Sequence, residues 1–372
     1  PDTGLYQIAE ESRSPVYFML TTEVSTVFRF KKEVKKIHHL ILTPKIETSA
    51  QISERLAEYC DLSVDGRPTL DIDAPQLVEE VMEVSKENMV IPTHIWTPWF
   101  SLFGAFSGFD TIEDCYQDTA KHIHALETGL SSDPAMNWRL SKLDKFSLVS
   151  NSDCHSFWPW RIGREANVFE LNKPSYRKLT DAIRNKNQEK FQFTIETFPS
   201  YGKYHWTGHR KCEVALPPKE AIRLGNICPV CRRKLTKGVE QRVEELADRA
   251  SGFKPESAKD FIHLLPLSEI IKTVLDISSL YAKKVWNVYN QLIERFGTEY
   301  TVLMDTSKQE LSKVVDEKIA EAIVRIRKGD VKVVPGYDGV YGRLIIFEEE
   351  NGEDTFPRKC NQSNLTRFMQ EN

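Results

Sequence analysis

Strand-like and helix-like segments alternate along the first half of this chain, and no other feature constrains its fold as strongly. Short apolar runs typical of buried strands lie near Val16, Ile37, Val90, Ile123, Phe146 and Phe191. Segments with helical periodicity lie between them, at 49–59, 74–85, 111–122 and 175–185. Strands that alternate with helices in this way predict an α/β layer or barrel fold.

The chain is long enough for two or three domains, with 372 residues of which 40% are hydrophobic and 28% charged. No apolar run approaches the roughly 20 residues of a membrane span, so we expect no membrane association. Seven cysteines, an odd number, predict a reducing compartment, the cytoplasm, and metal ligation by some of them. The chain starts at Pro1 rather than methionine and reaches a strand at once, so we expect a preceding N-terminal segment.

The segment 150–156 places Asp153 and His155 directly after the predicted strand Phe146–Val149. In an extended chain residues two apart point to the same side, so both side chains would face the region beyond the strand end. α/β folds carry their chemistry at that edge. The spacing fits a divalent metal site, although an Asp and a His that cap a turn would give the same pattern.

Three other strands carry metal-ligand side chains. Glu23 lies near the end of the strand Phe18–Val24, and His94 follows the strand Asn88–Thr93. His38 and His39 lie inside a third strand, at 37–42. Carboxylates and imidazoles at strand ends are the ligands of zinc, manganese or iron, and oxygen-rich positions also bind magnesium. We therefore expect these residues to converge on a metal cluster.

Aromatic residues with two glycines fill the segment 96–110, which follows His94 at once. Hydrophobic packing under a long loop is one interpretation. A lid beside the metals is the other, because aromatic rings can stack on bases. Trp158 and Trp160, just after His155, permit the same two interpretations.

A second metal motif lies near the middle of the chain. It consists of His209 and Cys212, then Cys228 and Cys231 after fifteen intervening residues. Two such pairs match the spacing of a structural zinc ribbon, in which two tight turns each supply two ligands to a tetrahedral ion. His205 is the alternative for the histidine ligand. The motif predicts a zinc ion that stabilises a small module.

The segment 201–237 around this motif is basic, with nine Lys or Arg and two Glu in a chain of net charge −4. The cations expected to contact a nucleic-acid backbone are Arg210, Lys211, Arg232, Arg233, Lys234 and Lys237. A basic face that is merely solvated would show the same composition.

The last third of the chain has helical periodicity, followed by a return to strand. Predicted helices lie at 239–250, 266–276, 279–296 and 312–327, and predicted strands at 331–334 and 344–347. These patterns divide the chain into an α/β domain over 1–198, a ribbon with a following helix over 199–254, and a mostly helical domain with a terminal hairpin over 255–372.

Four motifs resemble successive metal motifs of the polymerase and histidinol phosphatase (PHP) superfamily: Thr22-Glu23-Val24, His39-Leu40-Ile41-Leu42, Pro92-Thr93-His94 and Ser152-Asp153-Cys154-His155-Ser156. The resemblance implies a distorted (β/α)7 barrel that hydrolyses phosphoesters with divalent metals (Zn²⁺, Mg²⁺ or Mn²⁺). The implied metal ligands are Glu23, His39, His94, Asp153 and His155. His39 is favoured over His38 because the family's histidine precedes three apolar residues. The family's opening His-x-His strand, and a further Asp or His motif after it, have no counterpart here.

The PHP-like motifs, the ribbon, the run 238–249 and the segment Val334-Pro335-Gly336-Tyr337-Asp338-Gly339-Val340-Tyr341-Gly342 together are similar to the endonuclease Q family. This resemblance implies a DNA repair endonuclease that nicks 5′ to uracil, hypoxanthine, xanthine or an abasic site. Asp153, His155 and Glu23 would be catalytic, Arg164 would join the ribbon cations on DNA, and a replication or repair protein would be a partner. A small-molecule phosphoesterase of the same superfamily and a non-enzymatic DNA-binding adaptor are the alternatives.

Overall fold

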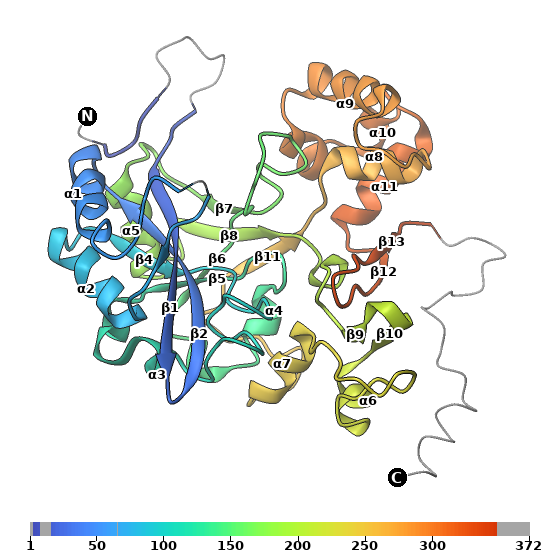
Figure 1. Ribbon diagram of the computed structural model, residues 1–372. Coiled ribbons are helices and arrows are strands. Elements are labelled where there is room, and N and C mark those ends of the chain that lie inside the picture. The colour runs from blue at the N-terminus through green and yellow to red at the C-terminus, as the bar shows by residue number, and fades with distance from the viewer. Residues whose placement is uncertain (1–2, 8–15, 65, 348–372) are drawn as a thin grey trace. The chain divides into compact units, whose positions relative to one another are not determined.

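The computed structural model describes residues 3–7, 16–64 and 66–347, which form two compact units (Figure 1). The first unit holds the described residues of Pro1–Val149, Asn167–Phe193 and Arg242–Asp260. The second holds those of Ser150–Ala166, Thr194–Gln241 and Phe261–Asn372. The units therefore interleave along the chain instead of following the three consecutive predicted domains. The predicted third domain ends outside the described residues, at 348–372.

A long antiparallel hairpin organises the first unit. Strand β1 (Leu20–Phe30) pairs with β2 (Glu33–Thr43) along its whole length, with Ser25 opposite His38 and Val24 opposite His39. The two connecting residues, Lys31 and Lys32, both have positive φ, 46° and 72°. Two positive φ values are the mark of a type I′ turn, whose twist matches that of the flanking strands.

This hairpin is the middle of a four-stranded sheet with the order β3-β1-β2-β4. The outer strands are β3 (Thr69–Leu70), parallel to β1, and β4 (Met89–Pro92), antiparallel to β2. Helices α1 (Ile46–Leu56) and α2 (Ala74–Val84) belong to the same unit, and Asp73 caps α2 by accepting a hydrogen bond from the Gln76 amide. The predicted alternation of strand and helix is confirmed here.

A second, parallel pair of strands follows, β5 (Ala125–Glu127) and β6 (Ser147–Val149). Between β4 and β5 the predicted helix 111–122 is split into α3 (Ile112–Tyr116) and a 3₁₀ turn, Gln117–His122, because Gln117 has a φ of 47°. In the sequence, helix α4 (Pro134–Asn137) lies between β5 and β6. One hydrophobic core joins β2, β4, β5 and β6 to the segment 176–191; it contains Leu42, Met89, Ile91, Ala125, Val149, Tyr176, Ala182, Ile183 and Phe191.

A three-stranded sheet has the order β11-β8-β7. Its strands are β7 (Ala166–Phe169), β8 (Phe191–Glu196) and β11 (Asp260–His263), and helix α5 (Tyr176–Arg184) connects the first two. The chain passes from one unit to the other within these strands. The pairings among the described residues give separate sheets, so the fold is mixed α/β, and the predicted closed ring of strands is not among them.

The second unit contains the ribbon and a helical region. The ribbon is built from β9 (Thr207–His209), β10 (Val214–Leu216) and α6 (Pro218–Arg223). Helix α7 (Val239–Leu246) follows it, and the chain passes into the first unit within this helix, at Arg242. The helical region comprises α8 (Leu267–Val274), α9 (Lys283–Phe296), a π-helical turn Thr301–Asp305, α10 (Lys308–Leu311) and α11 (Glu317–Arg327). The predicted terminal hairpin is β12 (Lys332–Val334) and β13 (Arg343–Ile345). None of the described helices has the length and apolar character that a membrane crossing needs.

Candidate metal centres

Glu23, His38 and His94 meet in the first unit as one group of metal-ligand side chains. One ligand atom from each lies within 4.8 Å of the others. The Glu23 Oε1 atom is 3.2 Å from Nδ1 of His38 and 3.8 Å from Nε2 of His94, and these two nitrogens are 2.6 Å apart. Residues from three different strands or strand ends thus converge, as the sequence predicts for Glu23 and His94.

The strand register explains why these side chains meet. Ser25 is opposite His38 in the β1–β2 ladder, so Glu23, two residues before Ser25, lies on the same face as His38. His94 follows β4, which pairs with β2, and the Thr93 amide donates to the carbonyl of His38 at 3.1 Å. The hairpin and its neighbour therefore deliver all three side chains to one place.

His39, the histidine favoured by the sequence, lies outside this group. Its side chain is fully buried on the opposite face of β2, with Nε2 2.9 Å from the Thr26 hydroxyl and Nδ1 2.9 Å from the Tyr116 hydroxyl. Both ring nitrogens thus have partners in the core. The family pattern of three following apolar residues selects the wrong member of the pair here, because alternation along the strand directs His38, not His39, toward Glu23 and His94.

The backbone at His94 is held in an unusual conformation, with a φ of 31°. Its amide donates to the buried Glu127 carboxylate at 2.8 Å, and the same carboxylate oxygen is 3.6 Å from Nδ1 of His94. Gly129 packs against this residue so closely that a Cβ there would lie 2.5 Å from that of His94. Positive φ at a bulky residue persists only where the surroundings enforce it, and such residues cluster at functional sites.

The charges in the group are arranged for a cation. Burial works against the charged form of Glu23, but the hydrogen bond from His38 and the charges of His94 and Arg67 outweigh it and lower the pKa of Glu23 to about 2. Burial also lowers the pKa of His38 to about 4, against the opposing effect of Glu23. At neutral pH the group therefore offers a carboxylate and a neutral imidazole, the protonation states that bind metals.

This donor set fits a catalytic divalent metal. One carboxylate and two imidazoles give three protein ligands, and catalytic sites of zinc and related metals keep a further position open for water or substrate. Arg67 also reaches the group: its Nε is 2.9 Å from Glu23 Oε1 and its Nη1 is 3.0 Å from Nε2 of His38. Neither Arg67 nor Glu127 was predicted as a member of the site, since neither belongs to a metal-ligand motif.

Asp153 and His155 belong to the second unit. Asp153 has a φ of 42°, and Nδ1 of His155 is 3.7 Å from its carboxylate and 3.1 Å from its backbone carbonyl. Both side chains are accessible, with His155 the more exposed. Arg164, expected on DNA, is largely occupied locally: it donates to the carbonyls of Ser152 at 2.8 Å and Asp153 at 3.2 Å. The structure thus brings Asp153 and His155 together with Arg164.

The two aromatic segments differ in their packing. In the segment after His94, Trp96, Phe103 and Phe109 are core residues, while Trp99 and Phe106 are exposed and stack on each other at 5.0 Å. After His155, the rings of Trp158 and Trp160 stack at 4.8 Å, and both pack against α9 through Trp286 and against Tyr281. The packing interpretation therefore accounts for most of these rings.

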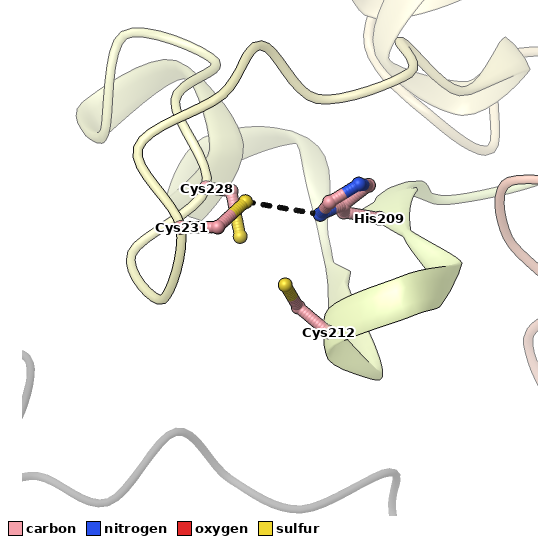
Figure 2. A group of neighbouring side chains, drawn as sticks. All are labelled: His209, Cys212, Cys228 and Cys231. Carbon is pink, nitrogen blue, oxygen red and sulfur yellow. Dashed lines mark hydrogen bonds between the residues drawn. The ribbon is translucent and has the colours of Figure 1, made fainter.

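The predicted ribbon residues form the second metal-ligand group (Figure 2). Its four members are His209, Cys212, Cys228 and Cys231. Nδ1 of His209 is 3.3 Å from the Sγ atom of Cys231. Three sulfurs and one nitrogen within 4.8 Å of one another are a donor set for structural zinc. His205, the alternative ligand, lies outside the group and pairs with Glu240 at 3.5 Å.

The ribbon has its own small core beneath the ligands. Cys228 is buried with Val214, Leu216, Ala221, Leu224 and Leu235, and Cys212 and Cys231 pack against this cluster. The turn that carries two ligands closes through backbone hydrogen bonds, from Arg232 to the Cys228 carbonyl and from Cys228 to the Arg233 carbonyl. Five of the predicted DNA-contacting cations are exposed on the module: Arg210, Lys211, Arg232, Arg233 and Lys234.

The segment 334–342 packs against the base of the ribbon. Gly336 accepts a hydrogen bond from the Trp206 amide, and the Asp338 carboxylate accepts one from the Arg210 amide at 2.7 Å. Tyr337 is buried there, whereas Tyr341 is exposed. Turn packing therefore explains Tyr337.

Curated relatives of the chain are themselves uncharacterised. The MJ0043 protein of Methanocaldococcus jannaschii is 34% identical over 254 residues, which are 67% of this chain and 31% of that protein, so the chain spans less than a third of this relative. YqxK of Bacillus subtilis is 27% identical over 314 residues, 83% of this chain and 73% of that protein. A family model described as the MJ0043 C-terminal domain matches residues 266–330, the region of α8 to α11.

Two solved structures resemble nearly the whole chain. The lesion-specific endonuclease PfuEndoQ of Pyrococcus furiosus has a TM-score of 0.81 and 31% identity, covering 98% of this chain and 84% of that one. An endonuclease Q complex with a 27-mer duplex that carries an abasic lesion at the active site has a TM-score of 0.80 and 30% identity, covering 97% and 85%. With this identity and coverage, the chain belongs to the endonuclease Q family.

Proposed function

We propose that this protein is a metal-dependent DNA repair endonuclease that hydrolyses the phosphodiester 5′ to deaminated bases (uracil, hypoxanthine or xanthine) and abasic sites. The observation that carries the proposal is the convergence of Glu23, His38 and His94 in a chain of the endonuclease Q family. A relative in that family was crystallised on duplex DNA with an abasic lesion at its active site. The mixed α/β sheets of the first unit would be parts of the distorted barrel that the PHP resemblance implies.

The proposed chemistry assigns a role to each residue of the group. A divalent metal, when bound, supplies Lewis acidity at the phosphate and an activated water. Glu23 would contribute the negative charge that holds the cation, and His38 and His94 would contribute imidazole nitrogens. Glu127 orients His94 through its amide, as hydrogen-bonded partners commonly do for metal ligands.

Asp153 and His155 stay in the proposal as further metal-binding and catalytic residues. Their support is the Ser-Asp-Cys-His-Ser motif and the accessible, mutually close side chains that it presents in the second unit. Arg164 is proposed to steady this segment through its bonds to the carbonyls of Ser152 and Asp153, and to contribute positive charge toward DNA.

The ribbon is proposed as a zinc-stabilised module that holds the DNA backbone. Arg210, Lys211, Arg232, Arg233 and Lys234 are exposed on it. Cations on a rigid support neutralise phosphates without reading sequence, which suits an enzyme whose target is a lesion rather than a site.

A nicking assay tests the proposal. A 5′-labelled duplex with a single uracil, hypoxanthine or abasic site is incubated with the protein and Mg²⁺ or Mn²⁺. We expect one incision immediately 5′ to the lesion, lost in Glu23→Gln and Asp153→Ala. Glu33→Gln, on the same hairpin, and Asp276→Ala, an exposed Asp with a similar φ of 51°, are matched controls that should retain it. Hydrolysis of a phosphate monoester without incision of DNA would contradict the proposal.

A further inference from the structure

Arg67 occupies the side of the first-unit group where a cation is expected. Its guanidinium lies against two of the three ligand residues, with Nε 2.9 Å from Glu23 Oε1 and Nη1 3.0 Å from Nε2 of His38. The side chain is 27% exposed, so one side of it faces solvent. The backbone beside Arg67 is held to β1, since the Ser25 amide donates to the Pro68 carbonyl at 2.8 Å. Strand β3 begins at the next residue, Thr69.

The hydrogen bonds around His38 fix which of its nitrogens carries the proton. Arginine only donates, so Nε2 of His38 must accept from Arg67. The proton of a neutral His38 ring is therefore on Nδ1, where it is shared between Nε2 of His94 at 2.6 Å and Glu23 Oε1 at 3.2 Å. In this state Arg67 and the two histidines form one chain of bonds with a single direction.

A metal ion at this group reverses that direction. The ligand atoms that face one another are Glu23 Oε1, Nδ1 of His38 and Nε2 of His94. A metal held on Nδ1 would require the His38 proton to lie on Nε2, because a neutral imidazole has one donor and one acceptor nitrogen. Nε2 then confronts Nη1 of Arg67 donor to donor, and the added positive charge repels the guanidinium as well. Arg67 must leave His38 when the metal binds.

The hydrogen bonding of the Arg67 guanidinium is also incomplete. Its Nε is buried and makes no aligned hydrogen bond, although it lies 2.9 Å from a Glu23 oxygen. A guanidinium carries five donors in a planar fork that matches the oxygens of a phosphate. With Arg67 displaced, the group would hold a divalent cation and a neighbouring guanidinium against two carboxylates, Glu23 and Glu127, and the remaining positive charge would favour a phosphodiester.

We propose that Arg67 competes with a metal ion for Glu23 and His38 and, when a metal binds to Glu23, His38 and His94, moves to bind the scissile phosphate. The second half of this proposal rests on the proposed nuclease function, while the first half does not. Arg67 thereby couples metal binding to substrate binding, because its guanidinium is available to a phosphate only when a metal is bound.

Metal binding tests the first half without any DNA. Mn²⁺ is titrated into wild-type protein, Arg67→Gln and Arg67→Lys, with free Mn²⁺ read by electron paramagnetic resonance. We expect Arg67→Gln to bind the first Mn²⁺ roughly 3–10-fold more tightly, the equivalent of about 0.7–1.4 kcal/mol, because no guanidinium has to be displaced. Arg29→Gln, which replaces an exposed arginine on β1, the strand of Glu23, should match wild type. Unchanged or weaker Mn²⁺ binding by folded Arg67→Gln would show that Arg67 does not compete with the metal.

The position of the His38 proton gives an independent readout. Long-range ¹H–¹⁵N spectra of histidine-labelled wild-type protein distinguish the two neutral forms of the ring. We expect a protonated Nδ1 in the metal-free protein and a protonated Nε2 after Zn²⁺ is added. A proton that stays on the same nitrogen in both states contradicts the switch, even if Arg67→Gln fails to fold.

Substrate charge tests the second half. Single-turnover incision is measured on a phosphodiester and on a methylphosphonate at the scissile position, which lacks the negative charge. We expect Arg67→Gln to slow phosphodiester incision at least about tenfold, with Arg67→Lys intermediate, and to change methylphosphonate incision much less. An equal loss on both substrates would remove the phosphate contact. Absence of incision by wild-type protein would sink the nuclease function instead and leave the Mn²⁺ result standing.

Discussion

Nδ1 of His38 and Nε2 of His94 lie 2.6 Å apart, closer than two nitrogens that share one metal ion. Two imidazoles on a tetrahedral zinc, each at about 2.0–2.1 Å, hold their nitrogens roughly 3.4 Å apart. The short contact is therefore a hydrogen bond between the rings. A metal ion bound to both rings would replace it, and the two nitrogens would have to separate by roughly 0.8 Å.

Replacement of His38 should abolish metal binding at this group, and replacement of its neighbour should not. We expect His38→Ala to weaken the first-unit site more than about 100-fold, since even the loss of outer partners of metal ligands costs 10–100-fold. His39→Gln should bind Mn²⁺ as wild type does, because the His39 nitrogens bond Thr26 and Tyr116. Metal titrations of the two variants test this prediction. Loss of Mn²⁺ binding in His39→Gln but not in His38→Ala would show that His39 is the ligand.

Gly129→Ala should damage the site as well as the fold. Gly129 and Gly225 have nearly equal φ, +62° and +61°, so an alanine at either position bears a similar left-handed strain of about 1–2 kcal/mol. Only at Gly129 does the new Cβ collide with His94, since nothing lies within 4 Å of it at Gly225. Urea unfolding of both variants should show a larger loss for Gly129→Ala, accompanied by weaker Mn²⁺ binding. Equal losses with unchanged metal affinity would refute the steric account.

Removal of one ribbon ligand should release one zinc ion per chain. Cys231→Ser breaks the group of four, and without the metal the small ribbon core is too slight to hold the module. Cys154→Ser, an exposed cysteine outside the group, is the control and should keep its zinc. Zinc content by atomic emission and susceptibility of the segment 201–237 to protease are the measurements. Full zinc content in Cys231→Ser would contradict the assignment.

The ribbon cations should control the salt dependence of DNA binding. Arg232, Arg233 and Lys234 are consecutive and exposed, and each phosphate contact contributes about 0.9 to the slope of log affinity against log salt. The triple alanine variant should therefore lower that slope by up to roughly 2.7. Lys31 and Lys32, exposed on the β1–β2 turn, supply a control pair. A slope that falls only in the control would place the DNA elsewhere.

Stability should depend on pH through His39. Burial, together with the nearby His38, lowers the pKa of His39 to about 3, far below its ordinary 6.5. Between pH 6.5 and about pH 3, His39 is protonated in the unfolded chain but stays neutral in the folded chain. The free energy of unfolding is therefore highest above pH 6.5 and falls by up to ~1.4 kcal/mol per pH unit toward pH 3.

His39→Gln isolates this contribution. Urea midpoints of the metal-free protein at pH 7.5, 6.5, 5.5 and 4.5 should decline less steeply in the variant, whatever its stability at pH 7.5. His38 remains in both proteins, so its own titration cancels in the comparison. Parallel pH curves for the two proteins would show that His39 is not held neutral by the fold.

Features that depend on local spacing could be predicted from the sequence. The ribbon ligands are two pairs, each closed by a tight turn, so His209 to Cys231 follow from the chain itself. The helices α8, α9 and α11 and the terminal hairpin were predictable for the same reason, since periodicity is a property of each segment. The Gln117 break in the helix 111–122 was not, because its cause is a single left-handed residue.

Features that depend on pairing between distant segments could not be predicted. Glu23 and His94 were identified by residue type, but the choice between His38 and His39 depends on how β2 aligns with β1. Arg67 precedes a two-residue strand and resembles any loop arginine in sequence. The two units likewise interleave because the chain crosses between them after β6 and within β7, β8, α7 and β11. No change in composition marks these crossings.

The two-lysine turn between β1 and β2 thus determines which side chains of β2 face Glu23. A strand shifted by one position would exchange inward and outward neighbours along its whole length. One residue added to or removed from that turn would bring His39 to the carboxylate of Glu23 and bury His38 beside Tyr116. The chain would keep the same candidate metal ligands, but they would no longer lie together.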